Sequence, residues 1–229
     1  MRDVSFLCAP GIRYALLGPN GSGKTTTMRL LATLLRPDAG SLMVAGCNLA
    51  EEPGVARTRI GYVAEDAGLD ARLTVREVLA FAASVRRLDN PGPRIGELAG
   101  ELGFAQFLDR RCGALSQGNR QKVAIARAVI HEPPVLLLDE PTANLDVEAA
   151  AATEALLASA HVGNRCLIVS THRLDEAERL CERVIGLQDG EVFLTAAVED
   201  VAAEASGEPD FRRGFLACLN ARQLANTAA

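Results

Sequence analysis

"LLGPNGSGKTTT", residues 16–27, joins an apolar run to a run of threonines through three glycines, and the chain folds around this stretch. The apolar run IRYALL, residues 12–17, ends at the first of these glycines and predicts a buried strand. We expect a helix over 25–35, stopped by Arg36 and Pro37, because proline disfavours a helical conformation in the residue before it. The stretch therefore predicts a strand, a glycine loop and a helix in succession.

The loop has the spacing of a phosphate-binding loop, in which two glycines bracket four residues and a lysine and a hydroxyl follow. Backbone N–H groups at the start of the helix can converge on phosphate oxygens, at the positive end of the helix dipole. Lys24 would reach the β- and γ-phosphates, and the Thr25 hydroxyl would bind Mg²⁺. A glycine turn without a ligand is the alternative, but it has no need of Lys-Thr at these places. The predicted nucleotide-binding residues are Gly18, Pro19, Asn20, Gly21, Ser22, Gly23, Lys24, Thr25 and Thr26.

Two further apolar runs lack the alternation of a half-exposed strand: VLLLD at 135–139 and CLIVS at 166–170. Such runs are typical of parallel strands that are covered on both faces. Helical patterns near 119–131, 147–160 and 174–183 alternate with them. The rhythm predicts an α/β fold with a mainly parallel sheet.

Polar side chains follow both of these runs. Asp139 and Glu140 end the first, and His172 follows the second. Ligands of open α/β sheets bind at the carboxyl edge, so we expect Asp139 to hold Mg²⁺ through its water shell and Glu140 to orient or deprotonate an attacking water. An acidic helix cap is the alternative for the carboxylates. His172 is a candidate contact to the γ-phosphate, although a lone histidine is more often structural.

The middle of the chain changes character twice. Between 40 and 64, the pieces SLMVAG and RIGYVA suggest a small antiparallel β element. Residues 66–113 are helical, with a capping box formed by Thr74 and Glu77 and a second helix near 94–109. With the helix that follows, they form a helical insert of about 66–130. Beyond Leu194 we expect two short amphipathic helices, 198–205 and 210–220.

Charge and hydropathy limit the partners. The net charge of −5 is spread without a basic stripe, so we expect no nucleic acid. No run approaches the roughly 18 uncharged residues that span a bilayer. We therefore expect a soluble chain, so that any route through a membrane must come from another protein.

Residues 115–146, LSQGNRQKVAIARAVIHEPPVLLLDEPTANLD, resemble the signature motif, Walker B strand and D-loop of the ATP-binding subunits of ABC transporters. The resemblance runs from about Val4 to Gly190. It implies an ABC-type P-loop NTPase domain over 1–193, with 194–229 as a short helical extension. It also assigns Lys24, Glu140 and the switch histidine His172 to catalysis. The implied signature contacts to the ATP of a partner subunit are Leu115, Ser116, Gln117, Gly118 and Asn119, and the implied D-loop is Asn144, Leu145 and Asp146.

Within this family, IGYVAEDAGLDARLTVREVL at 60–79 looks most like the exporters of the sodium-extrusion and multidrug type. The resemblance implies an ATP hydrolase that uses ATP and Mg²⁺ and lies on the cytoplasmic face of the membrane. It would power an exporter through a separate transmembrane permease subunit. It would close head to tail on a second copy of itself or on a related ATP-binding subunit. The alternatives are a soluble translation or DNA-repair ABC protein and a regulatory subunit with weak turnover; the intact Glu140 argues against the last.

The chain departs from the family pattern at two places. Glu65 stands where the family usually has glutamine, and a carboxylate is a good Mg²⁺ ligand that adds negative charge to the site. Our hypothesis is that Glu65 takes the place of that glutamine as a further metal ligand and supports turnover. The family also carries an aromatic residue, before VSF at 4–6, that stacks on adenine. Tyr14 is interpreted as a core residue instead, so we expect weak base recognition and a reduced preference for ATP over GTP.

Overall fold

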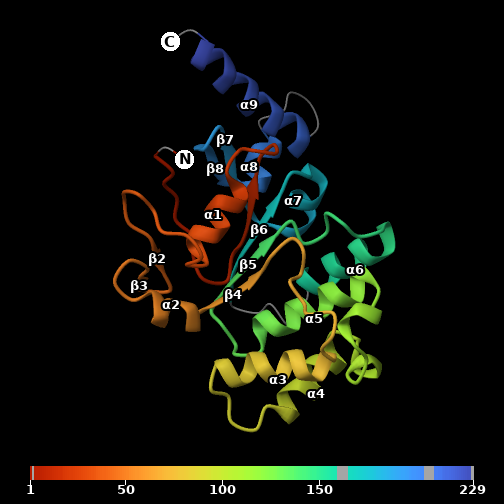
Figure 1. The fold of residues 1–229 in the computed structure, drawn as a ribbon. Helices are drawn as coiled ribbons and strands as arrows, with labels where there is room; N and C mark the ends of the chain where they lie inside the picture. Colours follow the sequence, from red (N-terminus) through yellow and green to blue (C-terminus); the bar gives the residue numbers. More distant parts are fainter. Residues whose placement is uncertain (2, 159–164, 204–208, 228–229) are drawn as a thin grey trace.

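A six-stranded sheet forms the centre of the structure, a computed structural model that describes residues 1, 3–158, 165–203 and 209–227 (Figure 1). Its first five strands in space are parallel, and the last is antiparallel to its neighbour. The α/β fold with a mainly parallel sheet is therefore confirmed. In spatial order the strands are β4 (Ile60–Val63), β5 (Val135–Asp139), β6 (Cys166–Thr171), β1 (Arg13–Leu17), β7 (Arg183–Gln188) and β8 (Glu191–Ala197).

Helices cover both faces of the sheet. On β1, Tyr14 and Leu16 belong to one apolar cluster with Met28 of α1 (Lys24–Leu31), and Tyr14 is a core residue as expected. Ala15 and Leu17 face the opposite cluster, which includes residues of α5 (Gln117–Val129) and α7 (Leu174–Leu180). Successive side chains of a strand point to opposite faces, so burial on both sides requires an apolar run without alternation. α6 (Val147–Ala158) packs beside α5.

The small antiparallel element is the hairpin of β2 (Met43–Val44) and β3 (Cys47–Asn48), joined to β4 through α2 (Pro53–Thr58). The assignment of RIGYVA to this element was wrong, because β4 pairs in parallel with β5 in the main sheet. A side chain at Gly61 would place its Cβ 2.4 Å from the carbonyl oxygen of Ala128 in α5. β4 therefore combines parallel pairing with β5 and close packing against α5.

The first two helices of the helical insert lie at the end of the molecule opposite α9 (Phe211–Thr227) in Figure 1. The insert begins with α3 (Val75–Val85), where the predicted capping box is present: the Thr74 hydroxyl accepts from the Glu77 N–H, and the Thr74 N–H donates to the Glu77 carboxylate. The helix expected near 94–109 is instead α4 (Gly92–Glu101), followed by 3₁₀ turns at Ala105–Phe107 and Cys112–Ala114. Gly103, with a φ of +69°, ends the α-helical path.

Two other predicted helices were too long. α1 ends at Leu31 rather than at 35, because Thr33 adopts a left-handed φ of +61°. α7 ends at Leu180 rather than at 183, because Cys181 is already extended and Arg183 begins β7. For the helix expected over 147–160, residues 159 and 160 lie outside the described residues.

The sequence reasoning missed β7 and β8. They form a hairpin whose turn, Asp189 and Gly190, has left-handed φ values of +53° and +77°. An Asp-Gly pair after an apolar run is a strong hairpin signal, and it was available in the sequence.

The end of the chain packs on this hairpin. α8 (Val198–Ala203) and α9 correspond to the two expected helices, although residues 204 and 205 lie outside the described part and α9 runs on to Thr227. Phe211 and Phe215 of α9 are buried in the same apolar cluster as one face of the sheet. Within the described residues, no helix is both long and apolar enough to cross a membrane.

Candidate nucleotide site

The site lies where three neighbouring parallel strands end. β1, β5 and β6 are adjacent, with Leu17 in register with Thr171 and Asp139 in register with Ser170. Their carboxyl ends therefore bring the glycine loop, the Asp139–Glu140 pair and His172 to one edge. An open cleft of about 270 Å³ lies there. It is lined by Asn20, Gly21, Gly23, Lys24, Thr25, Thr26, Glu65, Glu140, Ala143 and His172.

The loop conformation requires its glycines. Gly21 and Gly23 have φ values of +81° and +105°, and Gly23 is the N-cap of α1. A Cβ at Gly18 would lie 2.1 Å from the carbonyl oxygen of Leu187. Ser22 is buried, and its hydroxyl has no hydrogen-bond partner in the described part of the chain. The loop thus wraps the start of α1, where free N–H groups and the positive dipole end suit an anion.

Lys24 is a buried cation at the base of the cleft. Its Nζ donates to the carbonyl oxygens of Gly18 at 2.8 Å and Pro19 at 3.3 Å. The same Nζ lies 3.4 Å from Oε1 of Glu140. Charged groups rarely stay buried without partners, and here the loop's own carbonyls supply them.

Asp139 collects hydroxyl groups from three elements. Its Oδ1 accepts from Ser170 Oγ at 2.5 Å and from Thr25 Oγ1 at 3.3 Å, and its Oδ2 accepts from the Tyr62 hydroxyl at 3.5 Å. Burial and the nearby Asp139 charge raise the pKa of Tyr62 above its usual value. A carboxylate and a hydroxyl side by side are hard oxygen donors, and Mg²⁺ prefers such donors. The residues present therefore fit a magnesium ion.

Glu140 lies between Lys24 and His172. Its Oε2 is 2.9 Å from Nδ1 of His172, and its own φ is +48°, which is uncommon for a residue with a side chain. The Glu140 N–H donates to the carbonyl oxygen and to Oγ of Ser170, at 3.1 and 3.0 Å. The backbone after β5 is thus held in this conformation by β6.

The signature residues lie elsewhere. Ser116 caps α5, and its Oγ accepts from Asn119 Nδ2 at 3.0 Å. Leu115 is buried, Gln117 is exposed, and Gly118 packs so closely on α6 that a Cβ there would meet the Ala149 Cβ at 2.8 Å. Residues 115–119 are not among those that line the described cleft.

The D-loop residues likewise do not line the cleft. Asn144, Leu145 and Asp146 form the turn before α6, and Asp146 Oδ1 accepts from the Ala149 N–H at 2.8 Å. Their neighbour Ala143 lines the cleft and they do not. One chain therefore brings together the loop, Glu65, Glu140 and His172 without the signature or the D-loop.

Sequence reasoning missed two side chains of this site. Ser170 and Tyr62 hold Asp139, and neither was singled out. Ser170 lies two residues before His172 on a strand already expected to reach the site, so its position was a usable signal. Tyr62 had no such signal, because it depends on β4 lying next to β5.

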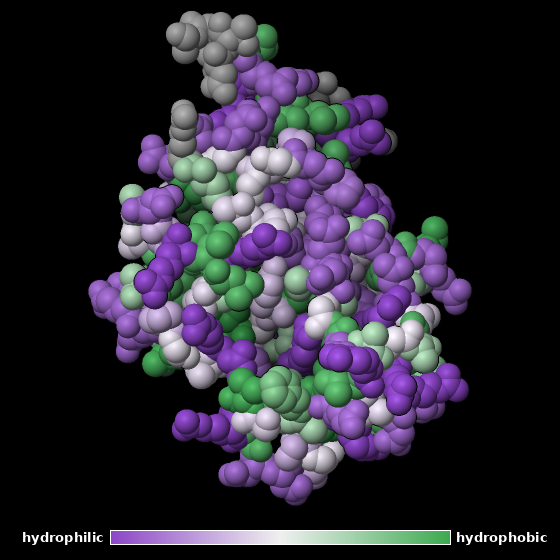
Figure 2. All heavy atoms as spheres, in the orientation of Figure 1, coloured by the Kyte–Doolittle hydropathy of each residue, from purple (hydrophilic) through white to green (hydrophobic). Residues whose placement is uncertain are grey.

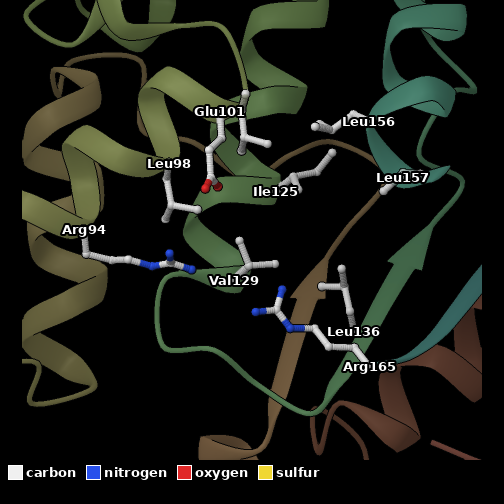
Figure 3. Close-up of a pocket in the computed structure, with 10 residues that line it drawn as sticks. Arg94, Leu98, Glu101, Ile125, Val129, Leu136, Leu156, Leu157 and Arg165 are labelled. Carbon is white, nitrogen blue, oxygen red and sulfur yellow. The ribbon is translucent and has the colours of Figure 1, made fainter. Parts of the chain in front are cut away.

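A second cavity is too small for a nucleotide. It holds about 30 Å³ between α4, α5, β5 and α6, room for roughly one or two waters. Figure 3 shows Arg94 and Arg165 reaching toward it from two sides, with Leu98, Ile125 and Val129 forming much of its wall.

Comparisons with known proteins agree with this geometry. A family model described as ABC transporter matches residues 1–143. The ABC transporter ATP-binding protein NatA of Bacillus subtilis is 35% identical over 204 residues, which cover 88% of this chain and 83% of that protein. The Nod factor export ATP-binding protein I of Paraburkholderia xenovorans is 35% identical over 212 residues, covering 89% of this chain and 68% of that protein.

Two solved structures are similar as well. An ATP-binding subunit of an ABC transporter superposes with a TM-score of 0.83 at 29% identity, covering 95% of this chain and 92% of that one. The dimeric ATP-binding cassette MJ0796, in a post-hydrolysis state bound to ADP and Pi, superposes with a TM-score of 0.77 at 28% identity, covering 85% and 88%. The chain therefore belongs to the ABC transporter family and is an ATP hydrolase of the ABC type.

Proposed function

We propose that this chain is the ATP-binding and ATP-hydrolysing subunit of an exporter, and that it works through a separate transmembrane permease subunit. The observation that carries the proposal is the cleft in which Lys24, Glu140 and His172 converge beside the phosphate-type loop. The name of one relative, the Nod factor export ATP-binding protein I of Paraburkholderia xenovorans, supports the direction of transport.

In this proposal the loop binds the phosphates of ATP. Backbone N–H groups of Gly21 to Thr25 donate to phosphate oxygens, and Lys24 exchanges its carbonyl partners for the β- and γ-phosphates. The buried Ser22 hydroxyl, which lacks a partner in the described structure, is a further donor available to the ligand. Asn20 and Thr26, on the wall of the cleft, complete the contact surface.

Thr25 and Asp139 would hold Mg²⁺, with Glu65, which lines the same cleft as Thr25, as a third oxygen ligand. The exposed Glu65 side chain can reach inward, whereas Asp139 is almost fully buried. Bound Mg²⁺ neutralises charge on the phosphate oxygens.

Glu140 and His172 would carry the hydrolytic step. Glu140 orients the attacking water or takes its proton, and His172 contacts the γ-phosphate. Their contact, 2.9 Å between Glu140 Oε2 and His172 Nδ1, orients the two side chains relative to each other. Lys24, 3.4 Å from Glu140, keeps that carboxylate directed into the cleft.

We propose that the signature residues complete the site of a second subunit. Ser116 and Gly118 lie at the N-terminus of α5, a positive dipole end that does not line the chain's own cleft. In a head-to-tail dimer they would donate to the γ-phosphate held by the partner, which is either a second copy or a related subunit. ATP then favours the closed pair and its products do not.

The permease partner would dock beside the Glu65 turn and α3. Phe81 and Val85 lie one helical turn apart on α3 and are 68% and 62% exposed. Figure 2 shows apolar side chains on the visible face over this helix. Such a docked chain would be peripheral, on the cytoplasmic face of the membrane.

Turnover by the purified chain tests the proposal. We expect Glu140→Gln to lower the rate of phosphate release by about 100-fold or more while the Kd for ATP changes by less than about twofold. Glu148→Gln, an exposed glutamate on α6, is the control and should leave both unchanged. Equal rates for wild type and Glu140→Gln would contradict the proposal. Co-purification of the chain with membranes would favour export over a soluble ABC protein of the translation or DNA-repair type.

A further inference from the structure

Glu176 is a buried carboxylate that has no part in the site described so far. It lies in the first turn of α7 and is 1% exposed. Burial raises its pKa above the usual value, although two threonine hydroxyls and Arg173 act in the opposite direction. A carboxylate held out of water is costly unless hydrogen bonds compensate it. Its partners therefore indicate what it does.

Both partners belong to the turns that carry the catalytic pair. Thr171 Oγ1 donates to Glu176 Oε2 at 2.5 Å, and Thr171 directly precedes His172. Thr142 Oγ1 donates to Glu176 Oε1 at 2.7 Å, and Thr142 lies two residues after Glu140. Each oxygen of the carboxylate thus holds one of the two turns, and both threonines are buried.

The neighbouring backbone tightens this bridge. Thr171 Oγ1 also accepts from the Arg173 N–H at 3.0 Å, so the turn around His172 is fastened on both sides of the histidine. Glu140 meanwhile has a left-handed φ of +48°. A strained backbone conformation persists only where its surroundings hold it in place, and the residues just after Glu140 are held by Glu176.

We propose that Glu176 is a positioning residue: its carboxylate joins the turn after β5 to the turn after β6 and so sets the contact between Glu140 and His172. α7 packs directly on β6, which gives the bridge a rigid base (Figure 1). The catalytic consequence rests on the proposed function above, whereas the structural consequence does not.

The structural consequence can be measured without turnover. The chain has three histidines, so the ring C–H signal of His172 can be assigned by labelling histidine and comparing wild type with His172→Gln. We expect this signal to move in Glu176→Gln, which offers one acceptor oxygen in place of two, and in Thr142→Val, which removes one hydroxyl at constant shape. Glu178→Gln is the matched control, because Glu178 is exposed on the same helix.

A His172 signal that stays at its wild-type position in both variants, with the circular dichroism spectrum unchanged, would overturn the proposal. Should Glu176→Gln fail to fold, Thr142→Val decides the matter alone. Thr142→Ser, which keeps the hydroxyl, should restore the wild-type signal.

Kinetics test the catalytic consequence. We expect Glu176→Gln and Thr142→Val each to lower kcat by about tenfold with KM for ATP within about twofold, because the phosphate loop on β1 is not part of the bridge. The double variant should lose little more than either single one, since both break the same bridge. An unchanged kcat would exclude the catalytic role. A wild-type chain that releases no phosphate would instead contradict the proposed function, and the His172 signal would still decide the positioning role.

Discussion

Lys24 and Asp139 are charged side chains that are 6% and 1% exposed, and each is held by oxygen-rich or hydroxyl neighbours. Burying a charge costs free energy that only close partners offset. Lys24 uses the carbonyls of its own loop, and Asp139 uses Ser170, Tyr62 and Thr25. Because Lys24 and Asp139 are already shielded from water, a ligand that enters the cleft replaces their present hydrogen-bond partners. It does not have to strip hydration shells from these two side chains. At the residue scale the site is therefore preorganised.

The proposed role of Glu65 as a Mg²⁺ ligand can be measured directly. If Glu65 binds Mg²⁺, Glu65→Ala should raise the Mg²⁺ concentration for half-maximal turnover by more than the roughly fivefold that one charge at close range contributes in water, because it removes an oxygen ligand as well as the charge. Glu65→Gln removes the charge but keeps an amide oxygen as a ligand, so its shift should be smaller, about fivefold or less. Magnesium titrations of the turnover rate give the comparison.

Asp66→Ala is the control for this experiment. Asp66 is an exposed acid in the same turn and does not line the described cleft. Unchanged rates and magnesium dependence in both Glu65 variants would remove Glu65 from the site.

At the element scale, two helical glycines have opposite surroundings. A Cβ at Gly214 of α9 would lie 1.7 Å from the carbonyl oxygen of Val201 in α8, so the two helices touch through this glycine. A Cβ added at Gly96 of α4 would have no other group within 4 Å in the described part of the chain. Replacing glycine by alanine therefore tests helix packing at Gly214 and intrinsic helix propensity at Gly96.

We expect Gly214→Ala to lower the free energy of unfolding by about 1–3 kcal/mol, because α9 must move away from α8. Gly96→Ala should raise it by about 0.5–1 kcal/mol, since alanine restricts the unfolded chain and favours the helix. Urea unfolding followed by circular dichroism measures both. A Gly214→Ala variant as stable as wild type would mean that the contact between α8 and α9 contributes little.

For the whole molecule, the main feature is that the signature residues at the start of α5 do not line the cleft. The cleft is built from the ends of β1, β5 and β6, while the start of α5 lies outside it. The neighbour MJ0796 is a dimer in its ADP-bound and Pi-bound structure. The proposed head-to-tail dimer would have a second subunit supply the signature residues to this cleft.

The dimer proposal predicts an ATP-dependent mass. With Mg²⁺ and ATP, Glu140→Gln should elute as a dimer in light-scattering chromatography, because bound ATP is not consumed. Adding Gln117→Glu should return it to monomer, since a carboxylate would then face the partner's phosphates; two like charges at close range repel by about 1 kcal/mol or more. Gln106→Glu, an exposed glutamine of the same insert, should leave the dimer intact. A Glu140→Gln chain that stays monomeric at all ATP concentrations would exclude the homodimer.

The sequence by itself determined the elements that depend on short-range hydrogen bonds, on glycine conformations or on a continuous run of apolar residues. Strands β1, β5 and β6 were predictable because burial on both faces favours an unbroken apolar run, which fills most of their positions. The glycine loop was predictable because Gly21 and Gly23 adopt conformations that other residues avoid. The capping box at Thr74 and Glu77 was predictable because its hydrogen bonds span only three residues. The convergence of the loop with Glu140 and His172 followed from parallel strands ending at one edge.

Only the tertiary structure decided which elements became neighbours. β4 lies in the main sheet beside β5, and α5, far along the chain, packs closely on its Gly61. Tyr62 reaches Asp139 only because β4 lies beside β5, and Glu176 joins two turns that are about 30 residues apart in sequence. Strand order and buried polar bridges depend on contacts between distant segments, and no local pattern encodes such contacts. The chain's own sequence thus determined the phosphate loop and its strands, whereas packing decided the partners that hold Asp139, Glu140 and His172 in place.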